Sequence, residues 1–405
     1  MLLPIFIEIP QDRCEIYLMP TKYISRANDI TTQLKKKSVL LLGPRRAGKS
    51  AFIRNELQPD HSYNLLQADT FQELSHRPSI VREKLKPSDR LVVIDEIQKL
   101  PVLMDEVHTM IEDHGVRFLI TGSSARKLKR SFTSLMAGRA RRRYLHPFCY
   151  GELRKNYRLH DIIERGAMPS VYLSANAEDA WDDLRDYAGM YLREEVLAEA
   201  LTRKIEAFSR FLTTAALSNA QLVRYESVAS DAQVPARTVR EYFAILEDTL
   251  MGHNLEPFRP QKLSRKSVST SKFYFFDLGV LNALVQRKAV NPASVEYGEL
   301  FETLIFLELK AYIDAKGLDT KLNFWRSHTG QEVDFVVNDA IGIEVKATQN
   351  VSERHMEGLA VLHKQIPLKR RLIVAHDKHS RQIGGVEVLH WRDFLEMLWD
   401  GLVVG

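Results

Sequence analysis

One short segment constrains this chain of 405 residues more than any other: GPRRAGKS, which runs from Gly43 to Ser50. It matches the pattern G-x-x-x-x-G-K-[S/T]. The apolar run SVLLL, which predicts a buried strand, precedes it, and the helix-like stretch AFIRNEL follows it. Glycines at such a junction let backbone N–H groups turn toward phosphate oxygens, and the start of the helix adds positive potential. The sequence therefore predicts a loop that binds the phosphates of a nucleotide.

A second motif, LVVIDE at positions 91–96, completes the predicted nucleotide site. Its apolar residues predict a buried strand, and Asp95 and Glu96 stand at the carboxyl end, where parallel sheets bind their ligands. Asp95 is expected to hold Mg²⁺ through water, and Glu96 to polarise the attacking water as a general base. Because simple nucleotide sensing does not need a general base, this glutamate favours ATP hydrolysis.

The side chains expected to contact ATP come from these two motifs and from a third strand. Lys49 is expected to reach the β- and γ-phosphates, and Ser50 to coordinate Mg²⁺. The third strand is followed by Thr121 and Ser123, either of which is expected to bond the γ-phosphate or the attacking water. The predicted nucleotide-binding set is Gly43, Pro44, Arg45, Arg46, Ala47, Gly48, Lys49, Ser50, Ala51, Asp95 and Thr121.

The chain divides by pattern into an N-terminal extension (1–19) and four further parts. Residues 20–154 alternate apolar runs with helix-like stretches, which predicts an α/β domain with a parallel sheet. Residues 155–217 read as helical, 218–290 as two short helices and a β-hairpin, and 291–405 as a second α/β unit. The strands expected in the first sheet are Ser38–Leu42, Tyr63–Leu66, Leu91–Ile94 and Arg117–Ile120.

Composition excludes several classes of protein. With 27% charged and 45% hydrophobic residues the chain resembles an average globular protein, and no apolar run reaches the roughly 18 residues of a membrane span. Its apolar first residues lack a basic leader and include Glu8, so no signal peptide is expected. Cys14 and Cys149 are too few for a disulfide framework or a zinc site. We therefore expect a cytoplasmic protein without a membrane partner.

Positive charge is concentrated in one segment. Residues 126–143 hold eight Lys and Arg and no acidic residue; removing these eight from the 57 Lys and Arg leaves 49 against 52 Asp and Glu. Such a segment suits a polyanion such as nucleic acid or nucleotide phosphate, although a solvated basic helix and loop is the simpler alternative.

Residues 219–258 have the pattern of a helix-turn-helix followed by a β-hairpin, as in a winged helix. A short helix, Ser227–Ala232, meets a turn at Pro235, and a second helix begins with Arg237, Thr238 and Arg240, where a recognition helix meets a groove. This favours DNA contact, but many such modules only pack against neighbouring domains.

The C-terminal part carries carboxylates in a chemically suggestive order. Glu302 lies in a helix-like segment, Asp334 in the strand-like EVDFVV, and Glu344 and Lys346 in GIEVKA. Period-two alternation places Glu344 and Lys346 on the same face of a strand. Carboxylates and a lysine around one point can bind Mg²⁺, with Asp334 and Glu344 as ligands, and activate a water. An edge salt bridge is the alternative interpretation.

Two family resemblances rest on these motifs. GPRRAGKS, LVVIDEIQKLP, FLITGSSARKL and MAGRA, with later pieces such as KFYFFDLGVLNAL and IEVKAT, resemble AAA+-type P-loop ATPases of bacteria and archaea that carry a C-terminal domain of unknown function. Relatives of that class usually work as rings, which implies a homo-oligomer, a hexameric ring, with Arg139 of MAGRA as the arginine supplied to a neighbour. Glu302, Asp334, Glu344 and Lys346 resemble the catalytic set of PD-(D/E)xK nucleases, and this resemblance implies a restriction-endonuclease-like C-terminal domain, although no proline precedes Asp334.

Two hypotheses follow. In the first, a Mg²⁺-dependent ATPase ring processes DNA, possibly branched, and its fused nuclease-like domain acts on that DNA. In the second, the chain is an ATP-dependent switch or scaffold with an inactive nuclease fold that binds DNA or protein partners.

Overall fold

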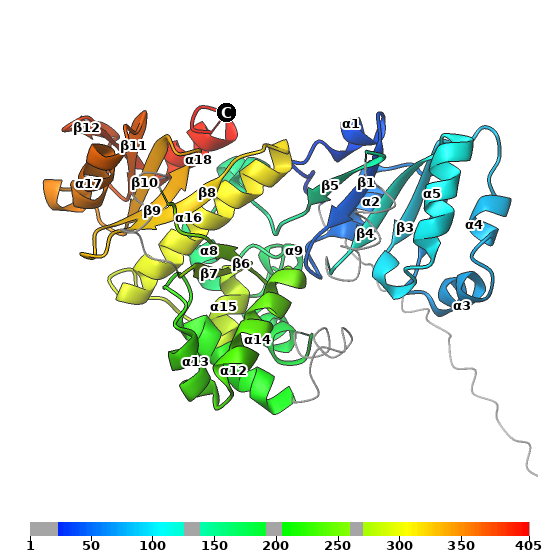
Figure 1. Cartoon of the computed structure of the whole chain (residues 1–405), viewed down its shortest axis with the longest axis horizontal. Coiled ribbons are helices and arrows are strands. Elements are labelled where there is room, and N and C mark those ends of the chain that lie inside the picture. The colour runs from blue at the N-terminus through cyan, green and yellow to red at the C-terminus, as the bar shows by residue number, and fades with distance from the viewer. Residues whose placement is uncertain (1–22, 125–137, 192–204, 260–269, 405) are drawn as a thin grey trace, which may run out of the picture.

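A computed structural model describes residues 23–124, 138–191, 205–259 and 270–404. Figure 1 shows a parallel sheet with its helices at one end of the molecule, a mixed sheet at the other end, and a group of helices below and between them. The first sheet orders its strands β2-β3-β4-β1-β5, and the second β12-β13-β11-β10-β9-β8.

The N-terminal sheet is entirely parallel, as the sequence predicts. Four of its strands coincide with the expected apolar runs to within two residues. The fifth, β5, was missed because its sequence, ARRRY, is polar; it lies at the edge of the sheet, where half of its surface need not be buried. The strands are β1 (Ser38–Leu42), β2 (His61–Asn64), β3 (Leu91–Asp95), β4 (Arg117–Gly122) and β5 (Ala140–Tyr144).

Helices cover both faces of this sheet because alternate residues of each buried strand point to opposite sides. Leu40 of β1 packs in one core with α3, α4 and α5, whereas its neighbour Leu41 packs in the other with α1 and α2. These helices are α1 (Ile30–Leu34), α2 (Lys49–Glu56), α3 (Ala68–His76), α4 (Ile80–Glu83) and α5 (Leu103–His114).

The middle of the chain is helical where the structure describes it. The predicted helix pair is present as α13 (Tyr225–Ala232) and α14 (Ala236–Asp248), with the expected apolar face of α14 buried. Antiparallel strands β6 (Gly252–Leu255) and β7 (Lys272–Phe275) form the hairpin that follows. The other helical elements are α7 (Tyr150–Leu153), α8 (Leu159–Arg165), α9 (Pro169–Tyr172), α10 (Ala177–Asp186), η3 (Tyr187–Tyr191), α12 (Ile205–Leu217) and α15 (Leu278–Leu284).

The C-terminal part begins with the long helix α16 (Val295–Lys316), which carries Glu302 as predicted, and continues as a mixed sheet. Of its six strands, β12 and β13 were not foreseen. The remaining elements are β8 (Leu322–Arg326), β9 (Glu332–Val337), β10 (Ile341–Lys346), α17 (Glu357–Gln365), β11 (Arg370–Ala375), β12 (Arg381–Ile383), β13 (Val386–His390) and α18 (Trp391–Trp399).

The middle helices, the hairpin and α16 share one hydrophobic core. Among the described residues, no helix is long and apolar enough to cross a membrane. Most of the basic segment 126–143 lies outside the described residues.

Candidate nucleotide site and carboxylate cluster

The predicted phosphate loop lies between β1 and α2 and needs both of its glycines. A Cβ on Gly43 would lie 2.5 Å from the carbonyl oxygen of Leu145, so no larger residue fits there. Gly48 has φ of +96°, a conformation that L side chains rarely adopt. These two constraints explain why glycine occupies both fixed positions of the motif.

Lys49 is buried inside its own loop. Its ammonium donates to the carbonyl oxygens of Gly43, at 2.7 Å, and Pro44, at 3.2 Å, and lies 3.6 Å from a carboxylate oxygen of Glu96. The loop therefore holds a positive charge at the start of α2, next to the predicted general base.

The structure brings Ser50 and Asp95 together from two different motifs. The hydroxyl of Ser50 donates to Oδ2 of Asp95 at 2.8 Å, and the hydroxyl of Thr121 donates to Oδ1 of the same carboxylate. Oxygen ligands of this kind are those that Mg²⁺ prefers. Since β4 lies between β1 and β3, Thr121 at its end is placed to bond the aspartate.

Two polar residues hold Glu96: Gln98, which the sequence analysis did not assign to the site, and Ser123, which it expected to bond the γ-phosphate or the attacking water. The amide nitrogen of Gln98 donates to Oε2 of Glu96 and, at 2.9 Å, to Ser123 Oγ, which in turn lies 3.2 Å from the same carboxylate oxygen. The amide oxygen of Gln98 is buried without a hydrogen-bond partner. Glu96 itself has φ of +64°, so its backbone is held in a conformation unusual for glutamate. Gln98 is in the motif DEIQ, but only the fold shows that its side chain turns back.

Arg26, which no motif indicates, fastens the outside of the phosphate loop. It is 7% exposed, and its guanidinium donates to the carbonyl of Ala47 at 2.7 Å and to that of His146 at 2.5 Å. It also forms a 2.8 Å ion pair with Glu152, next to β5 and α7. The loop is thus tied to the segment that leaves the ATPase domain.

Two further loop residues touch the helical middle of the chain. Arg46 lies 3.5 Å from Asp183 of α10, and the hydroxyl of Tyr187 donates to the carbonyl of Arg45 at 3.4 Å. The phosphate loop is therefore in contact with residues 183–187 of the helical middle of the chain.

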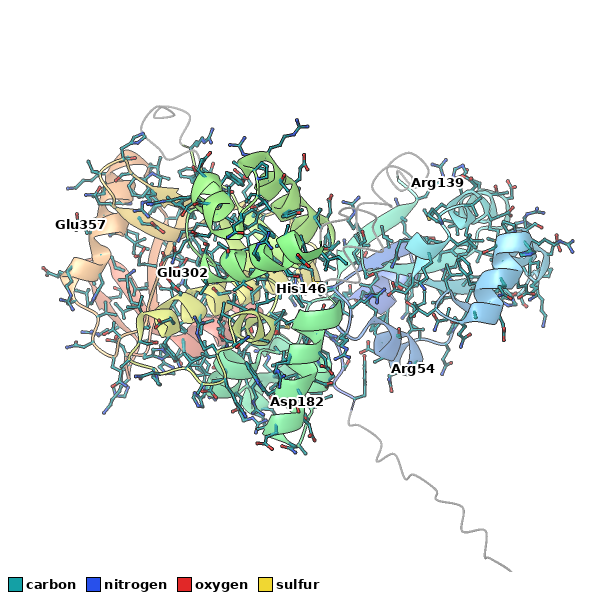
Figure 2. All side chains as sticks on the ribbon, turned by 90° about the horizontal axis from the view of Figure 1, so that it is seen from below. Arg54, Arg139, His146, Asp182, Glu302 and Glu357 are labelled. Carbon is teal, nitrogen blue, oxygen red and sulfur yellow. The ribbon has the colours of Figure 1, made fainter. Side chains whose placement is uncertain are left out.

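Arg139 lies just before β5, at the amino end of the parallel sheet, where Ala140 pairs with Ser38. The phosphate loop follows the carboxyl end of β1, so five strand residues, about 17 Å, separate the two positions. The side chain forms an ion pair with Glu112 of α5. Figure 2 labels it on the ATPase part of the chain. Arg139 therefore lies at the opposite end of β1 from the phosphate loop of its own chain.

The four predicted C-terminal residues lie on neighbouring elements, and Figure 2 labels Glu302 on α16. Asp334 of β9 accepts the backbone N–H of Val345 at 2.8 Å, which fixes it beside β10. Lys346 lies 2.6 Å from Oε1 of Glu344, so these side chains share a face of the strand as predicted. The other oxygen of Glu344 is buried without a hydrogen-bond partner.

A fifth residue, Lys272 of the hairpin strand β7, enters this carboxylate cluster from a different part of the chain. Its ammonium is 2.9 Å from Glu302 and 3.9 Å from Asp334, and it forms a further ion pair with Glu332. The hydroxyl of Tyr274, also on β7, donates to Glu302 at 2.6 Å. No motif in the sequence connects Lys272 with these carboxylates.

Burial and crowding shift the pKa values in this cluster. Burial raises the pKa of Glu302 to about 7, against the effect of Lys272. Burial, and then the charge of Asp334, raises the pKa of Glu344 well above its usual range. Burial alone would lower the pKa of Lys272, but Glu302 and the other acidic groups hold it well above its usual range. The cluster thus contains more carboxylate groups than lysines, and this excess of acidic groups disfavours their ionised forms.

A cleft of about 510 Å³ opens onto the cluster, and Lys272, Glu302, Arg326 and Glu332 line one part of its wall. Within the described residues, no group of three or more His, Cys, Asp and Glu side chains is arranged closely enough to hold a metal ion. Among the described residues, the side chains of Lys272 and Lys346 form the ion pairs of this cluster.

On the predicted recognition helix, Arg237 and Arg240 are exposed and lie near acidic side chains. Arg237 is 3.3 Å from Glu241, and Arg240 is 3.9 Å from Glu226. Exposed pairs of this kind are weak, so both guanidinium groups remain accessible to an anionic partner.

Three parts of the chain match known domain families. Residues 35–154 match a family described as an AAA domain, residues 156–291 a domain of unknown function, DUF8612, and residues 297–394 another, DUF4143. The chain thus has a P-loop ATPase domain of the AAA kind, which supports general ATPase activity, followed by two domains of unknown function.

A relative in Methanocaldococcus jannaschii, the uncharacterized protein MJ1544, is similar along most of the chain. It is 22% identical over 367 residues, which cover 82% of this chain and 79% of the relative. The similarity therefore extends through the AAA domain and beyond it.

Proposed function

We propose that the chain is a Mg²⁺-dependent ATP hydrolase with one nucleotide site, formed by Lys49, Ser50, Asp95, Thr121 and Glu96. The observation that carries this proposal is that the hydroxyl of Ser50 meets Asp95 at 2.8 Å while Lys49 and Glu96 lie side by side. Two separate motifs thus converge at the carboxyl end of one parallel sheet.

In this proposal, backbone N–H groups of the loop and Lys49 hold the β- and γ-phosphates, and Lys49 leaves its carbonyl partners to do so. Ser50 and Asp95 would hold Mg²⁺, which neutralises charge that develops on the phosphates during transfer. Gln98 and Ser123 hold the carboxylate of Glu96 in place. Glu96 accepts a proton from the attacking water.

The test is ATP hydrolysis by the purified chain with and without Mg²⁺, compared with an Asp95→Asn variant. We expect release of phosphate that depends on Mg²⁺ and falls at least about 100-fold in the variant, because one ligand of the ion is lost. Equal turnover in the variant would reject the site.

We propose further that the C-terminal cluster is a divalent-metal site of the PD-(D/E)xK kind, in which Asp334 and Glu344 hold the ion and Lys346 steadies a hydroxide or phosphate charge. The unpartnered oxygen of Glu344 supports this proposal, because a buried carboxylate oxygen otherwise has a partner. DNA is the proposed substrate, with the winged-helix-like pair α13–α14 as its contact.

A DNA panel distinguishes this motor-nuclease proposal from an ATP-dependent switch. Duplex, forked and four-way DNAs are incubated with the chain and Mg²⁺, with and without ATP. Cleavage that disappears in Lys346→Ala supports the nuclease; binding that changes with nucleotide, without cleavage, supports the switch.

The proposed ring requires a second chain, because Arg139 lies at the far end of the sheet from its own phosphate loop. We expect mixing of Arg139→Ala and Lys49→Ala chains, each inactive alone, to restore ATP turnover in part. No recovery in a mixed oligomer would remove Arg139 from the proposal.

A further inference from the structure

We propose that Lys272 is an internal cation of the C-terminal cluster: while the hairpin is docked, its ammonium replaces a divalent metal ion, and withdrawal of Lys272 converts the cluster into a metal site. This proposal rests on the metal site proposed above and is independent of ATP hydrolysis.

The position of Lys272 is the first argument. The residue is 3% exposed, and its ammonium contacts Glu302 of α16 together with Glu332 and Asp334 of β9. An ammonium group keeps carboxylate oxygens about 2.8 Å away, whereas Mg²⁺ requires them at about 2.0–2.1 Å. Of the proposed metal ligands, Asp334 lies nearest to this ammonium, with Oδ1 at 3.9 Å, so a metal ion on that oxygen would lie beside the charge of Lys272 and be repelled by it.

The second argument is that backbone contacts hold the hairpin, and with it Lys272, in place. Residues that follow β6 pair with β8, the edge strand of the C-terminal sheet: Phe324 donates its N–H to the carbonyl of Glu256 at 3.2 Å, and Phe258 donates to that of Phe324 at 2.5 Å. The backbone of Lys272 itself pairs with Leu255 and bridges Leu222. Because these contacts fix the backbone at Lys272 and the residue is 3% exposed, we expect release of the ammonium to require movement of the hairpin.

The third argument is the charge that would remain without Lys272. Glu344 would keep its ion pair with Lys346, but Glu302 and Asp334 would lose the ion pairs that they form with Lys272. One oxygen of Glu344 already lacks a partner. Buried like charges repel strongly where water is excluded. Such a cluster takes up protons or another cation, or it destabilises the contact between the hairpin and the C-terminal domain.

The cleft beside the cluster reaches Lys272 itself. Its wall combines residues of the middle part, such as Gln221 and Arg224, with Lys272, Glu302 and Glu332. A partner that enters this cleft would contact both the middle part of the chain and the C-terminal domain, between which Lys272 is held.

The test measures Mn²⁺ binding by electron paramagnetic resonance in nucleotide-free full-length chains that carry Ser50→Ala, so that the ATP site does not contribute. We expect Lys272→Met to bind one additional ion at least about tenfold more tightly than the parent chain, which corresponds to 1.4 kcal/mol. Adding Asp334→Asn should remove that ion, and Lys272→Arg, which keeps the charge, should bind as weakly as the parent.

Lys310→Met is the matched control, because Lys310 of α16 is partly buried and also pairs with a carboxylate, Asp314, at 2.6 Å outside the cluster. It should not change Mn²⁺ binding. If the parent chain binds as tightly as Lys272→Met, the metal site is right and the role of Lys272 is wrong. If neither the parent chain nor a folded Lys272→Met chain binds an ion at the cluster, both proposals about this cluster fail, whereas ATP hydrolysis is unaffected.

A measurement on the native chain covers the case in which Lys272→Met does not fold. Acetylation of lysines, followed by mass spectrometry, should modify exposed Lys35 far faster than Lys272. Equal rates would show that the ammonium is not seated among the carboxylates and would overturn the proposal.

Discussion

Lys49 and Lys272 are both buried lysines next to carboxylates, yet they are held in opposite ways. Lys49 bonds carbonyl oxygens five and six residues away in its own loop, with Glu96 at 3.6 Å. Lys272 bonds carboxylates 30 and 62 positions away, in a different domain. The first arrangement can open for a phosphate without moving the fold, whereas the second joins two parts of the fold.

This difference predicts opposite consequences when each lysine is removed. Removal of Lys49 should abolish ATP hydrolysis with little change in stability. Removal of Lys272 should change the contact between the hairpin and the C-terminal domain. The Mn²⁺ measurement on Lys272→Met tests the cluster, and the following variants test the nucleotide site and a further buried charge, Glu308.

The largest effect is expected from Lys49→Ala. The variant should lose about 1,000-fold or more of ATP turnover, because a charge aimed at the transferring phosphate is removed. Its melting temperature should change little, since the partners of Lys49 are carbonyls of a loop that water can reach once the side chain is gone. The control is Lys99→Ala, which changes an exposed lysine that follows Asp95 and Glu96 in the second motif. Persistent hydrolysis in Lys49→Ala would contradict the phosphate-site assignment.

Glu96→Gln separates binding from chemistry. We expect turnover to fall about 100-fold or more because the general base is removed, while affinity for ATP stays within about threefold. Steady-state hydrolysis and fluorescent-nucleotide titration measure the two quantities. A parallel loss of affinity would mean that Glu96 binds the nucleotide and does not act as the base.

Glu308 extends the comparison to a buried charge at the junction between domains. Its carboxylate accepts the N–H of Tyr150 at 2.9 Å and Nε1 of Trp399 at 2.8 Å, and burial raises its pKa to about 7. Its pKa in the unfolded chain is near 4.5, so its contribution to stability is full below pH 4.5 and is lost as pH rises through 7.

We therefore expect the wild-type chain to lose roughly 2 kcal/mol of unfolding free energy from this group between pH 5 and pH 8, and Glu308→Gln to lose that dependence. Urea denaturation at the two pH values measures it. An identical pH dependence in both proteins would show that Glu308 is not the titrating group.

The smallest effect is expected from Gln98→Ala. Turnover should fall about tenfold, with the Michaelis constant for ATP unchanged, because Glu96 loses a hydrogen bond that orients it. In a Glu96→Gln background the same change should have little further effect, since the group it orients is already gone. Independent, additive losses would assign Gln98 a structural role only.

Much of the nucleotide site was predictable from the sequence. Gly43, Gly48, Lys49, Ser50, Asp95 and Glu96 stand in two contiguous motifs, and each motif includes its own strand, so local patterns suffice to place them. Gln98 and Arg26 were not predicted as site residues because their side chains act across turns that the sequence does not display. Strand β5 was missed because an edge strand does not need an apolar run.

The C-terminal residues show the limit of local patterns. The order of Glu302, Asp334, Glu344 and Lys346 predicted one helix and two strands correctly, because side-chain periodicity follows from backbone geometry alone. Their distances from one another, and the entry of Lys272 among them, depend on how the hairpin packs against β8 and α16.

The amino-acid sequence by itself determined that this chain forms a parallel α/β domain with a phosphate loop and ends in a second α/β unit, because glycine conformation, apolar runs and strand alternation are local properties. Only the tertiary structure decided that a hairpin lysine neutralises the C-terminal carboxylates. Contacts between residues 30 or more positions apart arise from the packing of whole elements, and no short stretch of sequence encodes that packing.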